Sequence, residues 1–91
     1  MLKTSIFAVS STQETPVVLT VPCRQATIKE DAATATTAWQ LKGTAPNSVE
    51  IQKASGESVT LSFAAMKNAG ETIGFVKVTT GSPNFQLVEQ P

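Results

Sequence analysis

The 91-residue chain has no histidine and no tyrosine, one cysteine, one tryptophan and seven carboxylates. Histidine is the commonest proton carrier at neutral pH, and metal sites usually need histidine or paired cysteines. Only Glu30 and Asp31 are adjacent carboxylates. On a strand such neighbours point to opposite faces and cannot share a substrate, and in a turn we expect them to be solvated. The other glutamates towards the C-terminus are also expected to be hydrated: Glu50, Glu57, Glu71 and Glu89. These absences predict a protein that is not an enzyme, with no catalytic, metal-binding or cofactor-binding residues and no cofactor.

Cys23 is the single cysteine, so the chain cannot form an internal disulfide and its fold does not depend on an oxidising compartment. We expect Cys23 to begin a strand and to behave as a small buried hydrophobic residue. The alternative is a nucleophile, but no histidine is present to activate it, and only Arg24 could lower its pKa.

Charge is scarce as well. Charged residues make up 15% of the chain, and seven basic residues balance seven acidic ones. No run of basic residues is present, so we expect no nucleic-acid partner and no binding to anionic membranes. The longest early apolar stretch, residues 6–9, is too short for a signal peptide, and synthesis in the cytoplasm is expected. Near-zero net charge favours a homo-oligomer or a component of a lattice.

What the chain does have is alternation of apolar residues with threonine and serine, which number 13 and eight. Period-two patterns bounded by turn residues predict seven or eight short strands in one domain, residues 1–91. The predicted fold is all-β: a single-domain antiparallel β-sandwich, jelly-roll or immunoglobulin-like, although a small barrel accommodates the same strands. The predicted strands are residues 4–10, 15–22, 24–30, 37–42, 48–54, 58–64, 71–79 and 84–89. The first could instead belong to an extended N-terminal arm, residues 1–14, that adds to a neighbour's sheet.

Several local features carry specific predictions. Pro16 and Pro22 bracket residues 15–22, which indicates an edge strand. Apolar residues on both faces of residues 71–79 indicate a central strand, and Gly74 within it marks a bulge or a close approach of another backbone. Residues 31–36 predict a helical turn or a loop, and residues 64–70 a single helical turn.

A β-hairpin is predicted from residues 48–54 and 58–64. Both segments alternate regularly, and Gly56 in the short connection between them can take positive φ. The side chains expected to point inward from this hairpin are Val49, Ile51, Val59, Leu61 and Phe63.

Trp39 has two possible roles. With Leu41 on the same face of a strand, it is expected in the core. The alternative is an exposed platform for stacking on a sugar, which would suit a carbohydrate-binding β-sandwich.

Two segments resemble small structural proteins of tailed bacteriophages. They are VPCRQATIKED, residues 21–31, and AGETIGFVKVTTGSPNFQLVE, residues 69–89, which together cover about a third of the chain. Within this class the chain is similar to capsid decoration, or cement, proteins. The shared patterns are strands and turns, and no catalytic residues carry over.

The resemblance implies a virion component on the capsid surface that binds the major capsid protein lattice and stabilises the shell, often as a symmetric dimer or trimer. Two alternatives stay open at this point. One is another virion component, such as a head-fibre base, a tail protein or a receptor-binding module. The other is the carbohydrate-binding module.

Overall fold

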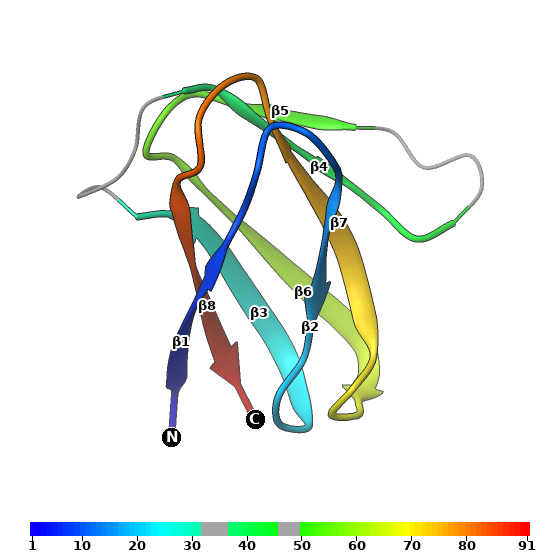
Figure 1. Ribbon diagram of the computed structural model, residues 1–91. Helices are drawn as coiled ribbons and strands as arrows, with labels where there is room; N and C mark the ends of the chain where they lie inside the picture. The colour runs from blue at the N-terminus through cyan, green and yellow to red at the C-terminus, as the bar shows by residue number, and fades with distance from the viewer. Residues whose placement is uncertain (32–36, 46–49) are drawn as a thin grey trace.

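The computed structural model describes residues 1–31, 37–45 and 50–91. These ranges contain eight strands and no helix (Figure 1). The strands are β1 (Lys3–Ala8), β2 (Thr15–Val18), β3 (Cys23–Glu30), β4 (Trp39–Lys42), β5 (Ile51–Lys53), β6 (Ser58–Lys67), β7 (Thr72–Val78) and β8 (Asn84–Gln90). The prediction for residues 31–36 and the inward placement of Val49 concern positions outside these ranges.

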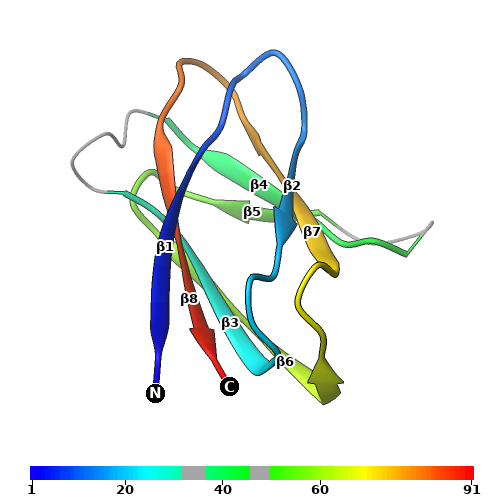
Figure 2. The ribbon, with the colours of Figure 1, turned by 60° about the horizontal axis from the view of Figure 1, so that its bottom comes forward.

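The strands form two four-stranded antiparallel sheets. Sheet A has the order β1-β8-β3-β6, and sheet B has the order β2-β7-β4-β5 (Figure 2). The pairing is nested: the first strand pairs with the last, the second with the seventh, the third with the sixth and the fourth with the fifth. Successive pairs alternate between the sheets, which is the connectivity of an eight-stranded jelly roll. The predicted β-sandwich is confirmed, and its strand order is that of the jelly roll.

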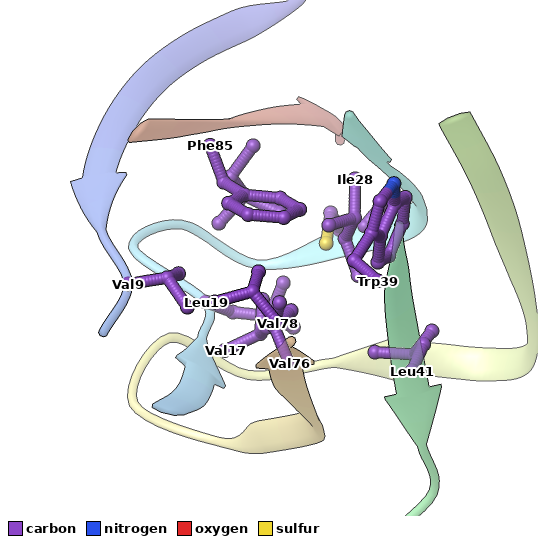
Figure 3. Close-up of a cluster of buried hydrophobic side chains, with 12 residues drawn as sticks. Val9, Val17, Leu19, Ile28, Trp39, Leu41, Val76, Val78 and Phe85 are labelled. Carbon is purple, nitrogen blue, oxygen red and sulfur yellow. The ribbon is translucent and has the colours of Figure 1, made fainter. Parts of the chain in front are cut away.

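The core lies between the sheets and follows from the alternation of each strand. In β3 and β8 every second side chain points inward, as Ile28 and Leu87 do, and is almost fully buried. Phe85 of sheet A meets Trp39 of sheet B edge to face, with ring centroids 5.0 Å apart (Figure 3). An aromatic pair of this geometry stabilises the contact beyond the burial of its surface.

Three predictions about sheet B are confirmed. β2 lies at its edge and β7 lies inside it, between β2 and β4. A side chain at Gly74 would have its Cβ 3.0 Å from both the Lys42 carbonyl oxygen and Leu41 Cδ1. The backbones therefore approach closely at Gly74, and β2 shifts register directly opposite, between Val17 and Val18.

β2 ends at Val18, four residues earlier than predicted. Beyond it, the Leu19 N–H donates to the Glu71 carbonyl at 2.9 Å, and the Gly70 N–H donates to the Leu19 carbonyl at 2.8 Å. These two bonds take the place of the β2–β7 ladder hydrogen bonds, because the chain leaves the sheet edge here and packs against the turn before β7.

The predicted hairpin of residues 48–54 and 58–64 is wrong. β5 pairs with β4 in sheet B, whereas β6 pairs with β3 in sheet A. Gly56 has the expected positive φ, 81°, but its turn carries the chain from one sheet to the other. Alternation records which side chains face inward, and it is the same for strands of one hairpin or of two facing sheets.

The helical turn predicted for residues 64–70 is also wrong, because β6 continues to Lys67 and a tight turn follows. Between Ser62 and Lys67 the register against β3 shifts, so that several β6 residues oppose one position of β3. The run of small residues there reflects a bulged strand.

Residues 1–14 are predicted to form a strand or an arm. In the monomer, β1 pairs along its whole length with β8 of the same chain, from Lys3 opposite Glu89 to Ala8 opposite Asn84. Both termini lie at the same end of the sandwich (Figure 1).

Candidate interaction surface

The outer face of sheet A carries few charges. We call it the neutral face. It comprises the side chains that alternate with the buried ones on its four strands: Thr4, Ile6, Ala8, Gln25, Thr27, Lys29, Ser58, Thr60, Ser62, Asn84, Gln86, Val88 and Gln90. Lys29 is the single charged residue among these thirteen positions, and the exposed Arg24 adjoins them where the register of β3 shifts.

Strand register arranges the neutral face in rows. Thr4, Val88, Thr27 and Thr60 lie opposite one another across all four strands. The Thr27 and Thr60 hydroxyls are hydrogen-bonded at 2.9 Å, which links β3 to β6 on the outside. In the next row Ile6 is 61% exposed, a large apolar side chain with nothing covering it in the monomer. The face therefore offers hydroxyls, amides and isolated apolar groups, and its desolvation removes little charge from water.

The outer face of sheet B differs. We call it the lysine face. Its outward side chains are Pro16, Val18, Gln40, Lys42, Gln52, Phe75 and Lys77. Lys42 lies opposite Phe75, which lies opposite Pro16, and Lys77 lies opposite Gln40. Two lysines and no carboxylate occur among these seven positions, compared with one lysine among the thirteen of the neutral face.

Two glutamates expected to be hydrated are fully buried. Glu89 on β8 is 0% exposed, and its carboxylate lies against the loop between β2 and β3. Oε2 accepts the backbone N–H of Thr20 at 2.8 Å and that of Val21 at 3.1 Å, while Oε1 accepts the Thr20 hydroxyl at 2.5 Å. Three donors thus surround one carboxylate, and the loop is held to the end of β8.

Glu30 is the second buried glutamate, also 0% exposed. Its Oε1 accepts the Gly56 N–H at 2.9 Å, which fastens the turn between β5 and β6 to the end of β3. Its Oε2, like the Trp39 indole N–H, has no hydrogen-bond partner in the part of the chain that the structure describes. The expectation that Glu30 is solvated is therefore wrong: it faces inward because it continues the buried alternation of Ala26 and Ile28.

Burial of these two carboxylates changes the charge that a partner meets. The sequence is neutral, with seven basic and seven acidic residues. None of the basic side chains is buried, whereas only five carboxylates remain outside the core. The accessible surface thus has more cations than anions, and the excess includes the pair on the lysine face.

Trp39 and Cys23 have the structural placements predicted for them. Trp39 is 1% exposed, so its ring is not available to stack on a sugar. Cys23 begins β3 and is completely buried. Burial raises the pKa of the Cys23 thiol, and the nearby Glu89 carboxylate raises it further, against a smaller lowering by the Gln25 backbone N–H. A raised pKa keeps the thiol protonated and weakly reactive at neutral pH.

One groove lies beside the edge strand β6, where sheets A and B approach each other. It has a volume of about 290 Å³ and is lined by the apolar side chains of Leu61, Phe63 and Ile73 together with Lys67 and residues 43–45. The Lys67 ammonium lies 5.8 Å from the centre of the Phe63 ring. Leu61, Phe63 and Ile73 pack against the core but remain half-exposed.

In residues 1–31, 37–45 and 50–91, no three cysteine or acidic side chains gather in an arrangement that could hold a metal ion. The same ranges contain no helix long and apolar enough to cross a membrane. Comparison with protein-family models, curated proteins and solved structures finds no match to this chain. Functional inference therefore rests on the residues and on the fold.

Proposed function

We propose that this protein is a bacteriophage capsid decoration protein that binds the outer surface of assembled shells and stabilises them without catalysing a reaction. The observation that carries the proposal is the neutral face. A four-stranded surface with one charge in thirteen outward positions suits extended contact with another protein.

The jelly roll supports this proposal in two ways. It is an architecture used by viral capsid domains, although also by lectins and cupins, so the fold alone does not specify the role. Its two packed sheets also make a stiff module, with both termini at the end opposite the turn that Glu30 fastens (Figure 1). A protein that clamps neighbouring capsid subunits needs such stiffness, since it must transmit load without bending.

The test compares two forms of one partner. Purified protein is mixed with empty shells assembled from the major capsid protein encoded in the same genome, and separately with that protein unassembled. Co-sedimentation is expected with shells and not with free subunits. Equal binding to shells and to free subunits would contradict the proposal. Labelled protein found at one vertex or on the tail would replace it with the alternative of another virion component.

A matched pair of variants locates the contact. Gln25→Glu adds a negative charge to the neutral face, and Gln52→Glu makes the same change on the lysine face. Burial of an unpaired charge costs about 1–3 kcal/mol, so Gln25→Glu is expected to weaken shell binding at least about tenfold. Gln52→Glu is expected to leave it unchanged. The reverse result would move the contact to the lysine face.

A further inference from the structure

The four edge strands of the two sheets are protected to very different degrees. In sheet B, β2 carries Pro16 and a register shift, and β5 is only three residues long and ends in Lys53. Prolines, bulges, charges and short length are the usual means of preventing strands from pairing between molecules. In sheet A, β6 is ten residues long and has no charge and no proline from Ser58 to Met66; its register shift lies beyond Ser62, so residues 58–62 form a regular edge. Its inner neighbour is β3, and no described strand pairs with its other side (Figure 2).

The hydrophobic core is also incompletely covered beside β6. Five partly buried hydrophobic residues pack against the core, and four of them lie beside the free side of β6: Val59, Leu61, Phe63 and Ile73. The groove described above opens there. An added strand would cover these side chains, since its own inward residues would extend the inner layer of sheet A.

The regular part of β6 is chemically self-complementary. Residues 58–62 read Ser-Val-Thr-Leu-Ser, with hydroxyl side chains outward and aliphatic side chains inward. In an antiparallel pair centred on Thr60, Ser58 lies opposite Ser62, Val59 opposite Leu61, and Thr60 opposite itself. Each residue then meets one of its own kind on the same face, which is the condition for favourable cross-strand pairs.

We propose that two copies of this chain form a two-fold dimer by antiparallel pairing of β6 with β6, centred on Thr60. A two-fold axis makes the same patch serve both partners, so that neither copy keeps an open β6 edge. The two copies of sheet A become one continuous eight-stranded sheet, and the neutral face doubles in width.

Charges at the ends of the paired segment agree with this register. Glu57 of one copy comes opposite Phe63 of the second copy. The Lys67 ammonium lies over the Phe63 ring of the same copy, 5.8 Å from the ring centre. Each end of the interface therefore brings the Glu57 carboxylate, which also accepts the Ala54 N–H at 2.6 Å, towards one ammonium group. The alternative pairing, β1 with β1, would put Lys3 of each copy within a shared strand pair that has no carboxylate on β1 to offset it.

Disulfide trapping tests the register directly. The Cα atoms of directly opposed residues in antiparallel strands are about 4.5–5.5 Å apart, within the range that a disulfide spans. Thr60→Cys in a Cys23→Ser background is expected to form a covalent dimer under mild oxidation at micromolar protein. Thr4→Cys in the same background, an outward threonine on the opposite edge β1, is the matched control and is expected to stay monomeric. Cross-linking through residue 4 and not residue 60 would overturn the proposal.

Light scattering of the unmodified protein supplies the second measurement, without cysteine chemistry. A mass of about twice 9.6 kDa is expected, and Thr60→Lys, which sets two ammonium groups opposite each other at the axis, is expected to halve it. Thr4→Lys should leave the mass unchanged. A monomer across the concentration range, or a dimer equally sensitive to both lysines, would contradict the β6 interface. Neither result depends on capsid binding, so the two proposals fail separately.

Discussion

Glu89 and Glu30 are both completely buried, yet their surroundings are opposite in kind. The Glu89 carboxylate accepts three hydrogen bonds from Thr20 and Val21, whereas the Glu30 carboxylate accepts one, from Gly56, among the described residues. The two groups are also far apart. Glu89 lies opposite Ala26 on β3, and Glu30 is four residues further along that strand, about 13 Å away.

Each glutamate holds one loop to one end of the sandwich, and the difference between them is the number of donors that the loop presents. At the Glu89 end, two consecutive backbone N–H groups and a hydroxyl converge on the carboxylate. At the Glu30 end, a single N–H from a glycine turn does so. Burial of a carboxylate is costly unless its oxygens are hydrogen-bonded, so the two glutamates should contribute very differently to stability.

The largest effect is expected from Glu89→Gln. The amide retains one acceptor oxygen, but its NH₂ group must face donors that the second carboxylate oxygen now satisfies. A free energy of unfolding lower by about 3 kcal/mol is expected, since hydrogen bonds to charged groups are worth about 1.5–3 kcal/mol each. Urea unfolding followed by Trp39 fluorescence measures it. Glu14→Gln, an exposed glutamate, is the control and should change stability by less than about 0.5 kcal/mol.

The second prediction concerns Cys23, whose thiol is influenced by the Glu89 carboxylate. Its thiol pKa is raised in the fold by burial first and by the Glu89 carboxylate second. A group whose pKa is raised by folding stabilises the folded state fully at pH values below its unfolded pKa, which is near 9.0 for Cys23. That stabilisation is lost as pH rises through the folded pKa. Stability above pH 9 should therefore fall by about 1.4 kcal/mol per pH unit more than in Cys23→Ser, until the buried thiol ionises.

Combining the two changes makes this prediction sharper. Glu89→Gln removes one cause of the raised Cys23 pKa and leaves the burial of the thiol in place. The alkaline loss of stability should then end at a lower pH than in the unmodified protein, but should not disappear. An identical pH profile with and without the Glu89 charge would show that the carboxylate does not influence the thiol.

The contrast between these glutamates also marks what the sequence can predict. Period-two alternation predicts seven or eight strands, the inward direction of Leu61 and Trp39, and the start of a strand at Cys23. Glu30 and Glu89 occupy inward positions of the same alternation, so the pattern itself contained the signal. It was outweighed by the general expectation that carboxylates are hydrated, which holds unless partners are present. Those partners, Gly56 and residues 20–21, are distant in sequence and only the fold brings them close.

Sheet assignment and surface chemistry were beyond the pattern for a similar reason. Residues 51–53 and 58–67 alternate as the two strands of a hairpin would. Each pairs with a different strand instead, β5 with β4 and β6 with β3, and alternation alone does not determine this choice. Low overall charge was readable from composition. Which outer face each charged side chain lies on depends on register, because a shift of one residue exchanges the two faces of a strand.

The smallest effect is expected from Glu30→Gln, and it is the direct test of the comparison. The amide oxygen keeps the bond from the Gly56 N–H, and the NH₂ group replaces an oxygen that has no hydrogen-bond partner among the described residues. The substitution also removes a charge from a fully buried position, which offsets any loss at the turn. Stability should therefore change by less than about 1 kcal/mol, in either direction, in the same urea experiment as Glu89→Gln. A loss as large as that at Glu89 would mean that Glu30 contributes as a fully bonded carboxylate does, and that the two ends of the sandwich are alike.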